Sequence, residues 1–184
     1  MINRRFNKLS AEAVWISSLE SSPLGAISVA VTEVGLRRVV FTPPGVLEEV
    51  YADWVMPIAN APQILFDTIT YLREFLTGKC HTISVPIDWR ACSQFEQEVL
   101  GATLSIPFGE VRSYGEIAHA LGNPSAARAV GGALSRNPIP IAIPCHRVVD
   151  SQRRLNGYTA PGGLAAKAWL LQLEGHRIVN NKLD

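Results

Sequence analysis

The sequence predicts an α+β protein that begins with a small sheet and continues mainly as helices. Short apolar runs separated by turn residues fill residues 14–42, which is typical of consecutive antiparallel strands. Apolar side chains then recur at helical spacing between residues 63 and 78. Two Ser-x-x-Glu sequences, beginning at Ser93 and Ser113, are each typical of a helix start. We therefore expect an N-terminal three-stranded antiparallel sheet with one helix, followed by a helical domain that contains a winged-helix-like helix-turn-helix.

The strands of the first half are delimited by two turns. Ser22-Pro23-Leu24-Gly25 and Glu33-Val34-Gly35 separate three apolar runs, which predicts a meander. Residues 1–13 are polar and are expected to be mobile. Residues 46–61 show no clear period and are expected to form a surface loop, whereas residues 82–87 predict one further short strand.

Length and composition permit two small domains. The chain has 184 residues, of which 47% are apolar, and this is enough to build a core. We predict an N-terminal α/β domain over residues 1–88 and a C-terminal domain over residues 93–184, with a short link between them.

Residues 113–136 predict the helix-turn-helix. Ser113 opens a helix that Gly122 ends, and Asn123-Pro124 forms the turn. Ser125 is predicted to cap a second helix that continues to about Arg136. Many proteins contain this motif without binding DNA, so the motif alone does not establish a function.

Charge collects in the same region. The net charge is only +1, but residues 112–154 hold six arginines against two carboxylates. Such a patch suits phosphate contacts, although a solvated face is the commoner explanation. Three cysteines form no disulfide framework, which favours a reducing, cytoplasmic location. We expect no membrane segment and no signal peptide.

The strongest chemical signal is the stretch Ile143-Pro144-Cys145-His146-Arg147-Val148. Thiolate is the nucleophilic form of cysteine, and a neighbouring imidazole and guanidinium both favour it. Pro144 fixes its own φ and biases Ile143 to an extended conformation. A cysteine followed by histidine is by itself more often a buried, unreactive residue.

The run over residues 106–148 resembles the O6-alkylguanine-DNA alkyltransferases. It reads IPFGEVRSYGEIAHALGNPSAARAVGGALSRNPIPIAIPCHRV, in which PCHRV is that family's active-site signature. The blocks SYGEIA, GNP-x-AARAVG and NP-x-P-x-x-x-PCHRV occur in the family's order and spacing. The resemblance implies an RNase H-like N-terminal domain. It also implies a single-turnover S-methyltransferase that moves an alkyl group irreversibly from O6-alkylguanine in duplex DNA to Cys145, with O4-alkylthymine as a further candidate substrate.

The resemblance assigns the chemistry to four residues. Cys145 is the nucleophile, and His146 is its base, acting through a water. Glu174 holds His146 in the required tautomer, and Tyr114 donates to the leaving base. The reaction that the resemblance implies needs no metal and no organic cofactor, and none is expected. The pair Cys80-His81 has no matching second pair of ligands for a metal ion.

The resemblance also places the second helix of the helix-turn-helix in the minor groove of double-stranded DNA, where its small residues allow close approach. Arg128 is the expected finger that fills the space of the extruded nucleotide, and Tyr114 is expected to crowd the 3′ phosphate. The other expected DNA-binding residues are Ser113, Ala126, Ala127, Ala129, Gly131, Ser135 and Arg136. The expected substrate pocket comprises Asn137, Pro140, Val148, Tyr158 and Thr159, with Asn137 as structural support. We expect a monomer, associated with the nucleoid if the source is prokaryotic.

Three other functions remain as alternatives. A cysteine hydrolase would use the same Cys145 and His146, but adjacent residues rarely form a direct nucleophile–base pair. Alkyltransferase-like damage sensors carry another residue at the cysteine position. A transcriptional regulator would need a further domain, for which we expect no room. Loss of duplex binding with retained reaction on a free base would separate these classes.

Overall fold

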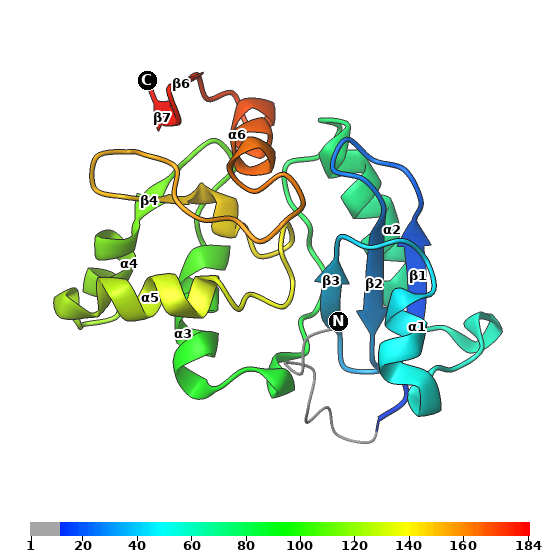
Figure 1. Cartoon of the computed structure of the whole chain (residues 1–184). Coiled ribbons are helices and arrows are strands. Elements are labelled where there is room, and N and C mark those ends of the chain that lie inside the picture. The colour runs from blue at the N-terminus through cyan, green and yellow to red at the C-terminus, as the bar shows by residue number, and fades with distance from the viewer. Residues whose placement is uncertain (1–11) are drawn as a thin grey trace.

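The computed structural model describes residues 12–184, so residues 1–11, most of the segment expected to be mobile, lie outside the described residues. Figure 1 shows a sheet with its helices on one side of the molecule and a group of helices on the other. The first group contains α1 (Val46–Tyr51) and α2 (Gln63–Leu76), and the second contains α3 (Gln94–Leu104), α4 (Tyr114–Ala120), α5 (Ala127–Leu134) and α6 (Leu164–Leu173). The α+β class is confirmed.

The N-terminal sheet is the predicted antiparallel meander, in the order β1 (Trp15–Leu19), β2 (Ile27–Val31), β3 (Leu36–Val40). Successive side chains point to opposite faces of a strand. Val29 therefore enters the main core, to which α2 contributes, and Ala30 enters a small second core closed by α1.

The prediction of a loop over residues 46–61 is wrong. This segment contains α1 and the 3-10 turns η2 (Ala52–Trp54) and η3 (Ile58–Asn60). Leu47 and Tyr51, four residues apart, are buried against the sheet. A helix of six residues is too short to show an apolar period in sequence, so only its packing reveals it.

The predicted strand over residues 82–87 is also wrong. The segment makes one isolated parallel bridge, between Leu36 and Ile87. The Leu36 amide donates to the Pro86 carbonyl at 2.8 Å, and the Asp88 amide donates to the Leu36 carbonyl at 3.0 Å. Pro86 has no amide proton and cannot continue a ladder, so the segment covers the edge of β3 without becoming a fourth strand.

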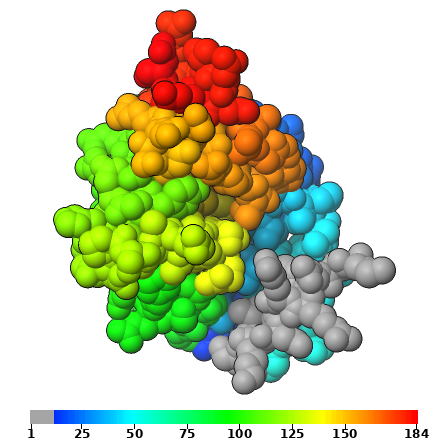
Figure 2. Space-filling view, turned by 60° about the vertical axis from the view of Figure 1, so that its left-hand side comes forward, coloured from blue at the N-terminus to red at the C-terminus, as the bar shows by residue number. Residues whose placement is uncertain are grey.

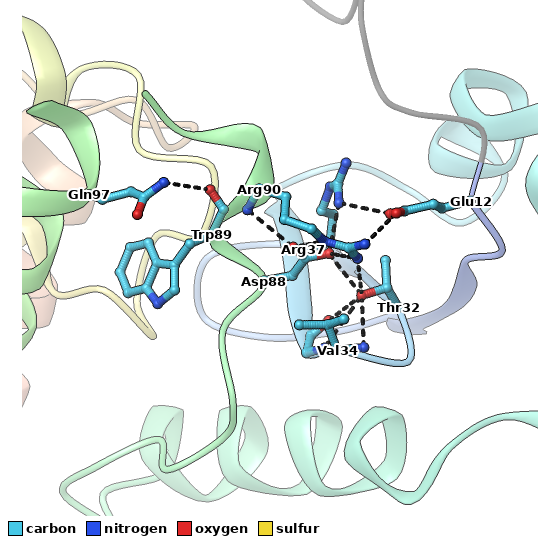
Figure 3. Close-up of polar contacts among 9 residues, drawn as sticks. Glu12, Thr32, Val34, Arg37, Asp88, Trp89, Arg90 and Gln97 are labelled. Carbon is cyan, nitrogen blue, oxygen red and sulfur yellow. Dashed lines mark hydrogen bonds and ion pairs between the residues drawn. The ribbon is translucent and has the colours of Figure 1, made fainter. Parts of the chain in front are cut away.

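A polar cluster around Asp88 fastens the link between the halves to the sheet (Figure 3). The buried carboxylate accepts from Arg37 Nη1 at 2.7 Å and from Thr32 Oγ1 at 2.8 Å. Arg90, at the start of the link, binds it through Nη2 at 2.6 Å and Nε at 2.8 Å and also pairs with Glu12. Sequence periodicity gives no sign of this cluster, because paired members are separated by up to 78 residues.

Replacing Asp88 by alanine is expected to lower the free energy of unfolding by about 3 kcal/mol, because the buried Arg37 guanidinium loses its nearer and buried counter-charge and keeps only Glu12 at 3.4 Å. Urea denaturation measures the effect. The matched variant Arg90→Ala removes a half-exposed partner and should cost less than about 1 kcal/mol. Equal losses in the two variants would contradict the assignment of a buried ion pair.

Both predicted capping boxes are confirmed. The Ser93 amide donates to Glu96 Oε2 at 3.0 Å, and the Ser113 amide donates to Glu116 Oε2 at 2.6 Å. The predicted cap at Ser125 is wrong. This residue lies in the 3-10 turn η5 (Pro124–Ala126), where its hydroxyl donates to Asn123 Oδ1 at 2.8 Å, and α5 begins only at Ala127.

Short strands place the cysteine motif beside the helix-turn-helix. The 3-10 turn η6 (Cys145–Arg147) leads into β5 (Val148–Val149), which runs parallel to β4 (Arg112–Ser113) directly before α4. The chain ends in a hairpin of β6 (Ile178–Val179) and β7 (Lys182–Leu183).

The division into domains at residues 1–88 and 93–184 stays a prediction. One apolar core includes Val29 and Phe75 from the first half and Leu100 and Ile143 from the second. Within residues 12–184, no helix combines the length and apolar character needed to cross a membrane.

Candidate active site and DNA-binding surface

Cys145 lies at a cavity of about 250 Å³ and is 8% exposed. The loop before it is held by Asn137, whose Nδ2 donates to the Ile143 carbonyl at 3.0 Å and whose Oδ1 accepts from the Ile139 amide at 3.0 Å. Within that loop Ile141 has φ 74°, a strained conformation for a β-branched residue. The two Asn137 hydrogen bonds help to hold this strained loop in place and so to position Cys145.

The two residues that follow Cys145 form a buried polar cluster with Glu174. His146 Nε2 is 2.7 Å from Glu174 Oε1, at the end of α6. Arg147 Nε donates to both Glu174 oxygens, at 3.0 and 2.9 Å, and its Nη1 donates to the Ile106 carbonyl at 2.6 Å. The expectation that the Arg147 guanidinium favours the Cys145 thiolate is therefore wrong, because this guanidinium is committed to Glu174.

The protonation states follow from these contacts. Burial raises the pKa of Glu174, but the hydrogen bond and charge of His146 and then of Arg147 outweigh it and lower the pKa to about 2. Burial lowers the pKa of His146, although Glu174 opposes the change. The neutral imidazole therefore donates from Nε2 to a carboxylate, which leaves Nδ1 as an acceptor. Nδ1 has no partner among the described residues.

Burial also raises the pKa of the Cys145 thiol, while a hydrogen bond with Asn137 and the charge of Lys167 act in the opposite direction. Cys145 and His146 are thus both neutral at rest near pH 7. The cysteine becomes a strong nucleophile only as its proton leaves.

Five of the predicted site residues line the same cavity as Cys145, whereas three of the five residues predicted for the substrate pocket do not. The five that line the cavity are Tyr114, Gly131, Ser135, Tyr158 and Thr159. Asn137 and Pro140 line a larger groove of about 720 Å³ beside β3, and Val148 is fully buried in β5. The structure therefore does not place Pro140 and Val148 at the cavity.

The predicted DNA-binding residues lie mainly on α4 and α5. Arg128 is exposed and forms no ion pair within residues 12–184, whereas Arg136 Nε donates to Glu96 Oε1 at 2.7 Å and is held against α3. Ala126, Ala127 and Ala129 begin the small-residue face, and Ser113 caps α4. Figure 2 shows the α4–α5 segment in green to yellow on one face with the orange loop that follows Cys145.

No group of three histidine, cysteine or carboxylate side chains in the described part of the chain is arranged to hold a metal ion. His81, considered above with Cys80 as a ligand pair, stacks on Phe108 with 4.1 Å between ring centroids.

The C-terminal half matches the family model described as the DNA-binding domain of 6-O-methylguanine DNA methyltransferase, over residues 94–180. The methylated-DNA–protein-cysteine methyltransferase of Methanosarcina acetivorans is 39% identical over 154 residues, which cover 84% of this chain and 94% of the relative. The chain belongs to this methyltransferase family. The predicted family is thus confirmed on most of the chain.

Solved structures agree with that assignment. The crystal structure of the O6-methylguanine methyltransferase of Mycobacterium tuberculosis aligns with a TM-score of 0.74 and 35% identity, covering 91% of this chain and 96% of that one. A crystal structure of that organism's protein in complex with DNA aligns with a TM-score of 0.72, also at 35% identity, and covers 87% and 92%.

Lys167 is the main site residue of this methyltransferase that the sequence analysis missed. It is 1% exposed, and its Nζ donates to the carbonyls of Val148 at 2.5 Å and Asn156 at 2.9 Å. Burial lowers its pKa to about 8, so it still carries a charge near pH 7. The signal in the sequence is a lone lysine inside the otherwise apolar run Leu164–Leu171.

Lys167→Met is expected to slow alkyl transfer roughly tenfold at pH 7, because Cys145 loses a nearby positive charge that favours its thiolate. In a plot of the transfer rate against pH, the rise in rate should occur at a higher pH in Lys167→Met than in the wild type. Lys167→Arg keeps the charge and should restore part of the rate. An unchanged pH profile in Lys167→Met would assign this residue a purely structural role.

Proposed function

We propose that this protein repairs O6-alkylguanine in double-stranded DNA by transferring the alkyl group to Cys145, once per molecule. The observation that carries the proposal is a cavity holding Cys145, backed by the buried His146–Glu174 pair and bordered by a helix-turn-helix. A cavity of about 250 Å³ has room for one extruded base.

The reaction is a displacement at carbon. Sulfur of Cys145 bonds to the alkyl carbon as that carbon's bond to guanine O6 breaks. The thiol proton passes to Nδ1 of His146, directly or through one water, and the electron pair leaves with the purine. Glu174 stabilises the imidazolium so formed, as the carboxylate does in other acid–base triads. Tyr114 donates a hydrogen bond to the leaving base, which offsets the charge that develops there.

The thioether has no good leaving group, so the product is permanent. Each chain carries its own nucleophile, base and recognition helix, and we propose that it acts as a monomer. Free cysteines at positions 80, 92 and 145 suit a reducing compartment such as the cytoplasm.

The small residues of α5 support approach to the minor groove. A Cβ atom added at Gly131 would meet the Tyr114 ring at 3.7 Å, which is ordinary contact, so internal packing does not require glycine there. Glycine in a helix costs about 1 kcal/mol relative to alanine. We infer that this cost is tolerated because the backbone of α5 approaches the DNA closely.

Mass analysis of the protein after incubation with a duplex holding one O6-methylguanine tests the proposal. The expected result is a single added methyl group on the peptide containing Cys145, with an equal molar loss of the lesion. An unmodified protein that still binds the lesion duplex would overturn the transfer reaction and favour a damage sensor.

Arg128→Ala is expected to slow repair of duplex DNA by at least about tenfold, since unstacking a base costs a few kcal/mol and the finger offsets part of that cost. Reaction with free O6-benzylguanine needs no base extrusion and should be unaffected. The two rates, measured by single-turnover kinetics, are compared with those of Arg73→Ala on α2. Equal losses on duplex and free base would remove the finger role.

A further inference from the structure

The loop after β5, residues 150–156, is held in shape by internal hydrogen bonds and carries two adjacent arginines. Asp150 Oδ1 accepts from the amides of Gln152 and Arg154, both at 2.8 Å, and Oδ2 accepts from the side chain of Asn156 at 3.2 Å. Arg153 has φ 62° at the tip of this turn. We call residues 150–156 the basic loop, because its single carboxylate is used to shape it while Arg153 and Arg154 are exposed.

The C-terminal hairpin, residues 178–183, braces the basic loop. Arg154 and Lys182 form an antiparallel bridge, the Leu155 amide donates to the Asn181 carbonyl at 2.8 Å, and the Leu183 amide donates to the Arg153 carbonyl at 3.0 Å. Leu155 and Leu183 are each 3% exposed in one apolar cluster. One isolated bridge thus joins the loop to the hairpin, which adds Lys182 to the exposed basic side chains.

Arg153 and Arg154 have acidic neighbours in Glu116 and Asp150, but these basic groups form no direct ion pair in the described chain. Neither Arg153, Arg154 nor Lys182 forms an ion pair within residues 12–184, and the nearby Asp184 carboxylate pairs with Arg177 at 3.3 Å. A braced surface whose exposed basic side chains form no direct ion pair suits a polyanion.

The basic loop lies beside the proposed DNA-binding helices. Tyr114, at the start of α4, donates to the Asn156 carbonyl at 3.4 Å. Hydrogen bonds from Ser113 lower the pKa of Glu116, and Arg112 and Arg153 act in the same direction, so Arg153 lies near the first turn of α4. Figure 2 shows this orange loop and the red C-terminal hairpin on the same face as α4 and α5.

We propose that the basic loop and the C-terminal hairpin form a second DNA-contact surface, on which Arg153, Arg154 and Lys182 bind backbone phosphates of the duplex that flanks the lesion. This inference rests on the proposed function and extends it beyond the recognition helix. Phosphate contacts fix the position of a duplex without reading its sequence. The surface therefore fixes the position of the flanking DNA while α5 contacts the duplex at the lesion.

The test is the salt dependence of binding to a short undamaged duplex, measured by fluorescence anisotropy. Each phosphate contact adds about one to the slope of log affinity against log salt. Arg153→Ser combined with Arg154→Ser should therefore reduce the slope by about two, and Lys182→Ser by about one. Arg73→Ser, which removes an exposed arginine from α2, should leave the slope unchanged.

Transfer from free O6-benzylguanine monitors the active site separately. A double variant that keeps the wild-type slope overturns the proposal. If the double variant no longer reacts with free O6-benzylguanine, the substitutions have disrupted the loop and its slope is not informative. The Lys182→Ser variant then provides the test, and an unchanged salt slope in that variant overturns the proposal. A wild-type protein that accepts no alkyl group from the lesion duplex or from free O6-benzylguanine would refute the proposed function. The salt slopes would still show whether the second DNA-contact surface exists.

Discussion

Replacing Cys145 by alanine is expected to abolish alkyl transfer completely while leaving binding to the lesion duplex nearly unchanged. Cys145 carries the only thiol among the described residues that line the cavity, and Nδ1 of the adjacent His146 has no other hydrogen-bond partner there and is free to accept the thiol proton. The side chain is small and buried, so its removal should cost about 1 kcal/mol of stability and keep the fold.

Two other cysteines provide the matched controls. Cys80→Ala and Cys92→Ala remove partly buried thiols away from the cavity and should retain full transfer. Radiolabelled methyl incorporation measures transfer, and anisotropy measures binding. Any transfer that persists in Cys145→Ala would refute the assignment of the nucleophile.

Glu174→Gln is expected to slow transfer by at least about 100-fold, because a neutral amide cannot stabilise the imidazolium that forms on His146. The same change leaves the buried Arg147 guanidinium without a counter-charge and should lower the unfolding free energy by about 3 kcal/mol. Single-turnover kinetics with free O6-benzylguanine isolates the chemical step from DNA binding. Glu110→Gln, an exposed carboxylate, is the control.

The pH dependence of stability gives an independent readout of Glu174. Its folded pKa of about 2 lies below the ordinary value of 4.5, so it stabilises the fold above pH 4.5. That contribution should disappear as pH falls from 4.5 towards 2. Urea denaturation across this range should show a shallower loss in Glu174→Gln than in the wild type. Parallel curves would exclude an ionised Glu174 in the folded protein.

Local features were predictable where the physical cause lies within a few residues. The capping boxes at Ser93 and Ser113 and the turn at Gly25 each depend on contacts between near neighbours in the chain. The three-stranded meander follows from such turns. The predicted cap at Ser125 failed because the chain already enters the 3-10 turn η5 at Pro124, so Ser125 lies inside a helical turn and not in front of one.

The sequence by itself determined the family, the cysteine motif and most of the residues around it, because these depend on residue type, order and spacing. Only the tertiary structure decided that Arg147 faces Glu174, that Lys167 is buried against the carbonyls of Val148 and Asn156, and that the C-terminal hairpin braces the basic loop. It also decided that Pro140 belongs to a different groove from Tyr158. The physical reason is that charge interactions and burial depend on distance in space, and residue spacing along a chain fixes that distance only within one element or turn.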